Sequence, residues 1–165
     1  MEIELLVYLN KIYPGHVSYE RLVSGPGLKN IYEFLIKTGR ETEPPELKQE
    51  AKGGDLTQLI SEWGRQNRDP GCIRALDWFL SLYGAEAGNL ALKFLARGGV
   101  YIGGGIAPHL LVKLKEGHFM QGFLDKGRFR SLLESIPVRV ILNDLTALLG
   151  AAEYARVLIK SQSAK

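Results

Sequence analysis

The 165-residue sequence predicts one mostly helical α/β domain, spanning residues 1–165, with a short parallel sheet. Apolar residues recur at helical spacing along most of the chain. Two β-prone runs, 98–105 and 137–142, are each followed directly by a helical pattern, which is typical of parallel α/β layers. The length fits a single domain, and a hydrophobic content of 45% is enough for one sizeable core.

Two helices and a loop are expected in the first third of the chain. Apolar spacing predicts a helix over 3–12, which ends at Pro14-Gly15 because proline cannot continue a helix. The polar segment 38–54 contains Pro44-Pro45 and is predicted to be a loop. Between them, a second helix starts near Pro26, whose fixed φ suits a first turn, and its apolar face consists of Leu28, Ile31, Tyr32, Leu35 and Ile36.

The middle of the chain predicts two further helices. Asp55 is expected to cap a helix that runs to about Gln66, and Asp69-Pro70 to open a longer helix that runs to about Ala96. Glycine is unfavourable inside a helix unless it permits close packing, and the longer helix contains two glycines. The residues of interest in this region are two tryptophans and one cysteine, all expected in the core, and the two glycines: Trp63, Trp78, Cys72, Gly84 and Gly88.

The last third contains the two predicted strands. The run 98–105 predicts a buried strand that enters a glycine-rich loop, and Pro108 then starts a helix. The run 137–142 predicts the second strand, and Asn143-Asp144 caps a final helix to about Ile159. Short helical segments are expected between the strands, at 119–125 and 129–134.

Charge and cysteine content argue against several classes of protein. The net charge of +3 needs no nucleic acid to explain it, because Lys and Arg are spread along the chain without a basic stripe. No apolar run approaches the ~18 residues of a membrane-spanning helix, and the N-terminus is acidic where a signal peptide is basic. The single Cys72 cannot form an internal disulfide, so a cytoplasmic location is expected.

Gly103-Gly104-Gly105 is the strongest chemical signal in the sequence. Between a strand and a helix, glycines let a ligand approach the backbone, and free N–H groups at a helix start favour anions. The pattern is not a dinucleotide fingerprint, because Pro108 stands where the third glycine belongs, and it is not a Walker loop, because no Gly-Lys-Ser or Gly-Lys-Thr occurs. A tight turn that needs positive φ explains these residues equally well.

The other candidate residues give weaker signals. No metal site is predicted, because the three histidines lack partners at metal-ligand spacing. Ser24-Gly25-Pro26-Gly27 is interpreted as a corner between helices. Glu20 precedes this corner, and a carboxylate binds sugars well because each oxygen accepts several hydrogen bonds, although an isolated glutamate is more often a plain surface residue. The histidines are His16, His109 and His118.

Three stretches of the chain together resemble bacterial glucokinase of the hexokinase superfamily. The first is 16–28, with Ser18-Tyr19-Glu20-Arg21 and the Ser24-Gly25-Pro26-Gly27 corner. The second is 88–108, which ends in the triple glycine, and the third is 123–138. Order and spacing agree from about residue 4 to residue 158, where the ending that contains Asn143-Asp144 also fits.

The resemblance implies a function and a set of ligands. The implied fold is an actin-like ATPase of two lobes, in which this chain is the larger C-terminal lobe. The implied reaction is phosphorylation of glucose at its 6-hydroxyl by ATP with Mg²⁺. By resemblance, Glu20 binds the sugar, while Gly103, Gly104 and Gly105 form the loop that lies alongside the adenosine of the nucleotide. The family also suggests a homodimer formed through this lobe.

Three family motifs have no counterpart in the chain. They are an Asp-x-Gly-Gly-Thr phosphate loop, an Asn-Asp pair whose aspartate is the catalytic base, and a Gly-Glu-Gly-Gly-His stretch, and all lie upstream of the part matched here. Phosphoryl transfer needs a base for the hydroxyl and donors for the phosphates. The expectation is therefore a C-terminal portion, produced by truncation, an internal start or a split gene, that carries no catalytic residue and is inactive alone.

Two other functions stay open on the sequence. A non-catalytic module would bind a partner, such as a separate N-terminal half, or associate with itself, because missing strands leave sheet edges exposed. A related sugar kinase or a sugar-sensing regulator of the same superfamily would share these motifs, because most of the sugar contacts lie in the missing portion.

Overall fold

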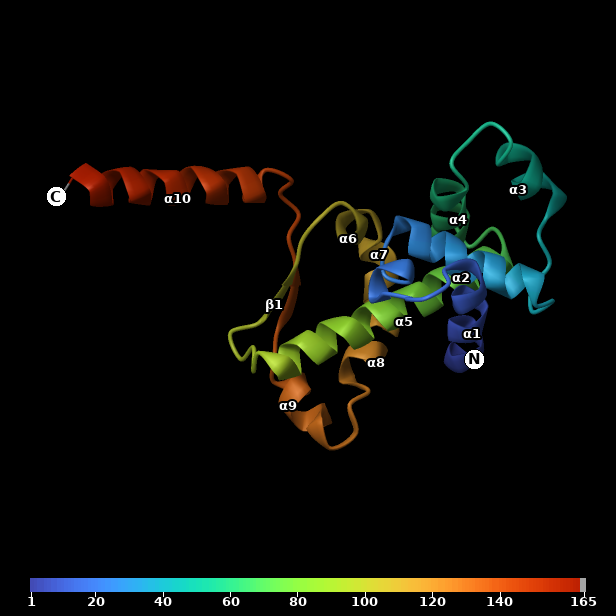
Figure 1. Ribbon diagram of the computed structural model, residues 1–165, viewed down its shortest axis with the longest axis horizontal. Coiled ribbons are helices and arrows are strands. Elements are labelled where there is room, and N and C mark those ends of the chain that lie inside the picture. Colours follow the sequence, from blue (N-terminus) through green and yellow to red (C-terminus); the bar gives the residue numbers. More distant parts are fainter. Residues whose placement is uncertain (164–165) are drawn as a thin grey trace.

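The computed structural model describes residues 1–163 and places most of the helices around α5 (Pro70–Lys93), while α10 (Thr146–Ser163) projects away from them (Figure 1). The N-terminal half of α5 packs against α2 (Gly25–Lys37) and α4 (Leu56–Arg65), and its C-terminal half packs against α8 (His118–Leu124). The remaining helices are α1 (Glu2–Ile12), η1 (Tyr19–Arg21), α3 (Pro45–Glu50), α6 (Ile106–His109), α7 (Leu111–Lys115), η2 (Gly127–Phe129) and α9 (Arg130–Glu134).

The two strands found in the described residues form a parallel pair, as the sequence predicts. β1 (Val100–Ile102) pairs with β2 (Val138–Val140), with Val100 opposite Val138. The helices from α6 to α9 connect them, because parallel strands need a crossover of this kind. The strands are shorter than predicted, and β1 is not buried throughout, because Tyr101 is 60% exposed while Ile102 is buried. A sheet of this width is covered on one face, which exposes alternate side chains of β1.

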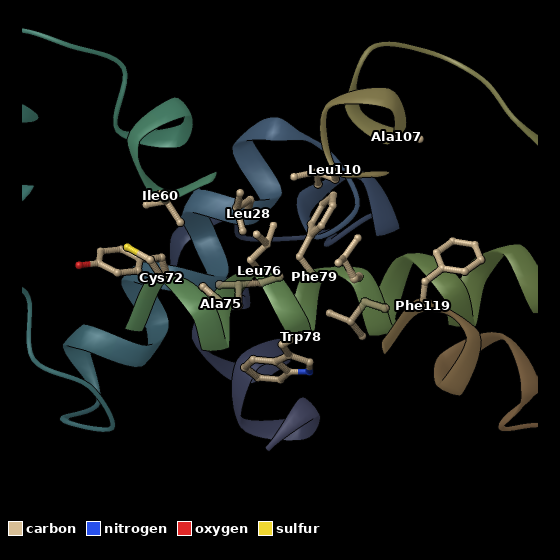
Figure 2. Close-up of a cluster of buried hydrophobic side chains, with 14 of the residues drawn as sticks. Leu28, Ile60, Cys72, Ala75, Leu76, Trp78, Phe79, Ala107, Leu110 and Phe119 are labelled. Atoms are coloured by element: carbon tan, nitrogen blue, oxygen red, sulfur yellow. The ribbon is translucent and has the colours of Figure 1, made fainter. Parts of the chain in front are cut away.

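The core is one cluster of buried side chains that extends from α1 to α9, and part of it lies where α5 faces α2 and α4. Figure 2 shows Leu76 and Phe79 of α5 pointing toward Leu28 of α2, and Ile60 of α4 lies close to them. All of these side chains are buried, as are both tryptophans that the sequence assigned to the core. Cys72 is also fully buried, and this burial raises the pKa of its thiol well above the usual range. The thiol therefore serves as a small core residue, as predicted.

Glycines let α5 and α8 cross at backbone contact. A Cβ atom on Gly84 would lie 1.8 Å from the carbonyl oxygen of Phe119, and one on Gly88 would lie 2.5 Å from that of Phe123. From the other side, a Cβ on Gly122 would lie 2.0 Å from the carbonyl oxygen of Ser81. The prediction that glycines inside the long helix serve close packing is confirmed.

Asp69 caps the N-terminus of α5, and its loss is expected to destabilise the chain. The backbone N–H of Cys72 donates to Asp69 Oδ1 at 2.8 Å, and Asp69 is 7% exposed. Asp69→Ala should lower the free energy of unfolding by about 2 kcal/mol, the upper end for a lost cap, because the orphaned N–H is buried. Asp55→Ala is the control, since Asp55 caps α4 through Thr57 at an exposed position. Urea denaturation should show a smaller loss of unfolding free energy for Asp55→Ala than for Asp69→Ala. Equal losses would contradict this account.

The segment 38–54 is not only a loop, which corrects the sequence prediction. It contains α3, which begins after Pro44 and carries the fully buried Leu47. Proline is well suited to a first helical turn, so Pro44-Pro45 starts a helix here. A single apolar residue in a polar segment is too weak a pattern to indicate a buried turn.

The last helices also differ slightly from expectation. α6 begins at Ile106, two residues before Pro108, and α10 continues past Ile159 to Ser163. Asn143 precedes α10 as predicted, and its Oδ1 accepts from the backbone N–H of Leu145 at 2.9 Å. Within residues 1–163, no helix combines the length and the apolar character needed to span a membrane.

Candidate functional site

A cavity of about 720 Å³ lies where the N-terminus of α2, one face of α4 and the turn after β1 meet. It is the place where the glycine-rich turn and the Ser24-Gly25 corner come together, although they are about 80 positions apart in the chain. The lining residues are Ser24, Gly25, Leu28, Thr57, Gln58, Ser61, Glu62, Arg65, Phe79, Gly105, Ile106, Pro108, His109 and Leu110.

The triple glycine forms a turn with open space on one side. Gly104 has φ of +98°, so its backbone conformation favours glycine. Gly105 has φ of −70°, which any residue adopts, and a Cβ atom added there would meet nothing within 4 Å. The turn alone explains glycine at position 104, but neither the backbone nor packing within the chain requires glycine at position 105.

The Ser24-Gly25-Pro26-Gly27 corner is the N-terminus of α2. Ser24 Oγ accepts from the backbone N–H of Gly27 at 3.1 Å and donates to the carbonyl oxygen of Glu20 at 2.6 Å. Gly27 is needed for packing, because a Cβ atom there would lie 2.2 Å from the carbonyl oxygen of Leu22. The predicted corner is thus present, and its first two residues also face the cavity.

Glu20 lies beside the cavity and is not one of its lining residues. It belongs to η1 and its side chain is exposed. The hydrogen bond from Ser24 Oγ to its carbonyl oxygen connects it to the cavity rim. The structure therefore brings Gly105 and the Ser24 corner onto one cavity, whereas Glu20 lies outside the cavity lining and contacts it only through its backbone carbonyl.

A polar row on α4 forms a wall of the cavity that the sequence analysis missed. The opposite face of α4 buries Ile60 and Trp63 in the core, so the polar positions turn toward the cavity. Arg65 Nη2 donates to the Glu62 carboxylate at 2.8 Å, which lowers the pKa of Glu62 and holds both side chains in place. The amphipathic pattern was visible in the sequence, but a polar helix face is usually covered by solvent.

A buried lysine in α7 anchors the chain that follows the cavity-lining helix α6. Lys113 of α7 is 2% exposed, and its Nζ lies 2.7 Å from Glu116 Oε2 and 3.7 Å from Asp77 Oδ1 of α5. The ammonium also donates to Asn67 Oδ1 at 3.2 Å, in the turn after α4. These partners tie the segment that follows the glycine turn to both α4 and α5.

The described residues contain no cluster of His, Cys, Asp or Glu that could hold a metal ion. His109 lines the cavity, and His118 Nε2 lies 3.5 Å from Asp77 Oδ2 on another face. The structure therefore does not bring the three histidines together. Among the described residues, Glu62 carries the only carboxylate that lines the cavity, and it is already paired with Arg65.

A family model described as Glucokinase matches residues 1–158. The chain belongs to the glucokinase family. This membership confirms the resemblance that the sequence motifs indicate, and glucokinases are kinases, which transfer a phosphoryl group.

Similar proteins extend the comparison over nearly the whole chain. The glucokinase of Synechocystis is 46% identical over 167 aligned positions, and the alignment covers 94% of this chain and 47% of that protein. The glucokinase of a Nostoc species is 44% identical, and the alignment covers 92% of this chain and 48% of that protein. The chain therefore spans about half the length of the curated relatives it matches.

A solved glucokinase structure from an Antarctic psychrotroph superposes with a TM-score of 0.74 at 32% identity. The superposition covers 90% of this chain and 43% of that glucokinase. The predicted fold class, a mostly helical portion of a hexokinase-type, actin-like fold with a short parallel sheet, is confirmed by this match and by the strand pairing.

Proposed function

We propose that this chain is the nucleotide-holding larger lobe, the C-terminal portion, of a glucokinase that transfers the γ-phosphoryl group of ATP to the 6-hydroxyl of glucose. One observation carries the proposal: Gly105 and the Ser24-Gly25 corner line the same cavity of about 720 Å³. That volume lies in the range of small-molecule sites. Membership of the glucokinase family supports the substrates.

The chemistry of the cavity suits a nucleotide. Ile106 and Pro108 offer apolar surface for a base on one side, and Gln58 and Ser61 offer hydrogen-bonding groups on the other. The missing Cβ at Gly105 leaves room for a ligand to approach the backbone. In this proposal the loop of Gly103, Gly104 and Gly105 lies alongside the adenosine portion of ATP.

Glu20 is proposed to bind the sugar. An exposed carboxylate at the rim accepts hydrogen bonds from two sugar hydroxyls, which orients the ring beside the nucleotide. The short hydrogen bond from Ser24 fixes the backbone at Glu20 relative to the N-terminus of α2. Sugar and nucleotide sites thus share one structural element.

The other half of the enzyme is proposed to supply the proton acceptor and the phosphate contacts. Phosphoryl transfer requires a base for the attacking hydroxyl and positive groups or a metal ion at the phosphates. In the described residues the carboxylate that lines the cavity is held by Arg65, so the residues present do not form a Mg²⁺ site and no catalytic base is assigned to this chain.

Three broader statements belong to the same proposal. The chain is one domain over 1–165, the complete enzyme is a homodimer, and it acts in the cytoplasm in the first step of glucose breakdown. The single cysteine is consistent with that compartment. Residues 164–165 lie outside the described residues.

Two measurements on the purified chain test the proposal. A fluorescent ATP analogue should bind to the chain, and a coupled assay for glucose 6-phosphate should show no turnover above a blank without protein, because the base is absent. Turnover by the chain alone would contradict the assignment of the base to the other half. Absence of nucleotide binding would favour a non-catalytic module.

Filling the open space at the glycine turn should block the nucleotide. Gly105→Leu is expected to weaken binding of the ATP analogue at least ~10-fold, while the thermal midpoint is unchanged because φ at this position suits any residue. Gly98→Leu is the matched control, since Gly98 also has no neighbour within 4 Å of a Cβ atom and does not line the cavity. If the Gly105 variant bound the ATP analogue as tightly as the unaltered chain, the turn would not be part of the nucleotide site.

A further inference from the structure

Lys113 of α7 is a charged residue in the interior of the molecule, and it is only 2% exposed. Taking an ammonium group out of water is costly unless its donors find partners. The three donors of the ammonium here face three polar side chains, those of Glu116, Asp77 and Asn67. Well-packed apolar residues often replace such a buried ionic group without loss of stability. Stability alone therefore does not explain a lysine at this position.

The three partners of Lys113 belong to different parts of the fold. Glu116 directly follows α7 itself, and Asp77 belongs to α5. Asn67 lies in the turn after α4, and its Oδ1 accepts a hydrogen bond from Lys113 Nζ at 3.2 Å. The hydrogen bond to Asn67 is therefore the contact that joins the lysine to the end of α4.

This hydrogen bond connects two walls of the cavity just beyond their lining residues. On α4 the lining ends at Arg65, two positions before Asn67. After the glycine turn the lining ends at Leu110, three positions before Lys113. Neither Asn67 nor Lys113 is among the described residues that line the cavity. Their effect on a ligand has to pass through the walls that they connect.

The backbone of Asn67 adopts a conformation that favours glycine. Its φ is +56°, in the left-handed region, which asparagine tolerates and glycine adopts without steric cost. Glycine would therefore form the turn at least as well. What asparagine adds at this position is an acceptor for the Lys113 ammonium, which glycine does not have.

We propose that Lys113 and Asn67 are positioning residues of the cavity. The hydrogen bond between them holds the polar wall on α4 at a fixed spacing from segment 105–110, so that both walls contact the same nucleotide. This inference rests on the proposed function for the identity of the ligand. The spacing itself is a property of the chain, and it can be tested without nucleotide.

Asn67→Gly removes the acceptor and keeps the turn. It should weaken binding of the fluorescent ATP analogue to the full chain about 10-fold, because the two walls are no longer held at one spacing. Asn67→Asp keeps an oxygen that accepts from the lysine, so it should bind the analogue as tightly as the unaltered chain. A residue needed only for the turn would give the opposite order, with glycine as the better substitute.

Amide exchange tests the spacing in the absence of nucleotide. The backbone N–H of Leu110 donates to Ile106 and that of Leu114 donates to Leu110, so both amides report on the segment that Lys113 anchors. Both should exchange at least ~10-fold faster in Asn67→Gly than in the unaltered chain, while the amides of α2 should not change. Faster exchange throughout the chain would indicate a general loss of stability and would overturn the proposal.

Lys113→Met is the second variant, and Lys115→Met is its matched control. Both substitutions remove an ammonium group from α7, but Lys115 is exposed. Lys113→Met should weaken analogue binding at least as much as Asn67→Gly, and the control should bind like the unaltered chain. Lys113→Met also takes the buried ammonium away from Asp77 and should lower the thermal midpoint, so binding is compared well below that temperature. If Lys113→Met unfolds the chain, the Asn67 variants decide the question.

The two measurements separate this inference from the proposed function. If the unaltered chain and Asn67→Gly bind the analogue equally well, the inference is wrong and the proposed function stands. If the unaltered chain does not bind the analogue, the proposed function fails, and exchange at Leu110 and Leu114 decides the positioning role by itself. Faster exchange confined to that segment would support the role, and unchanged exchange would overturn it.

Discussion

Gly122→Ala is expected to unfold the chain or to lower its free energy of unfolding by more than about 3 kcal/mol. The added Cβ would lie 2.0 Å from the carbonyl oxygen of Ser81 and 3.0 Å from the backbone nitrogen of Ala85. Both atoms belong to the backbone of α5, so they cannot move aside without shifting the helix. The crossing of α5 and α8 would have to widen, and the stacked rings of Phe119 and Phe123 would lose their packing.

A loss of stability on Gly122→Ala is informative because helix propensity alone would make this substitution stabilising. Alanine is favoured over glycine inside a helix by about 1 kcal/mol. Gly150→Ala in α10 is therefore a suitable control, since a Cβ atom there would meet nothing within 4 Å. Urea denaturation followed by circular dichroism should show a large loss for Gly122→Ala and no loss for Gly150→Ala. A Gly122 variant with an unchanged midpoint would show that the helices do not cross at backbone contact.

Glu20→Ala in the complete enzyme is expected to lower kcat/KM for glucose by 100-fold or more. Each hydrogen bond to a charged group contributes about 1.5–3 kcal/mol, and the carboxylate is proposed to accept two of them from the sugar. Steady-state kinetics with glucose varied at saturating ATP measure the effect. KM for ATP should change little, because Glu20 does not line the cavity.

Glu46→Ala provides the control for this experiment, since Glu46 is an exposed carboxylate on α3 and also does not line the cavity. It should leave both kinetic constants unchanged. Unaltered kinetics with glucose in the Glu20 variant would remove this residue from the sugar site. A loss that appears only in the KM for ATP would move it to the nucleotide side.

Most of the fold could be predicted because its signals are local. Asp55 and Asp69 mark helix starts through caps that need only the next three residues. The apolar spacing of α2 and the β-prone runs around β1 and β2 are also short-range patterns. α3 escaped prediction because its evidence is one side chain, Leu47, whose burial depends on residues elsewhere in the chain.

The site was predictable only in part. The glycine turn and Glu20 were identified through a resemblance to a family, and the local chemistry of either one alone did not distinguish a site from a plain turn or surface. The row on α4 that contains Glu62 and Arg65 gave no signal of its own, because the same pattern serves a helix that faces only water. Which face of a helix meets a cavity depends on what lies opposite.

The amino-acid sequence by itself determined most of the helices, the two parallel strands and the family, because capping, periodicity and motif order are properties of neighbouring residues. Only the tertiary structure decided that the α2 corner and the turn after β1 share one cavity, and that α10 is left without cover. Both outcomes depend on contacts between residues far apart in the chain, and those contacts are set by how closely α5 packs against α2, α4 and α8.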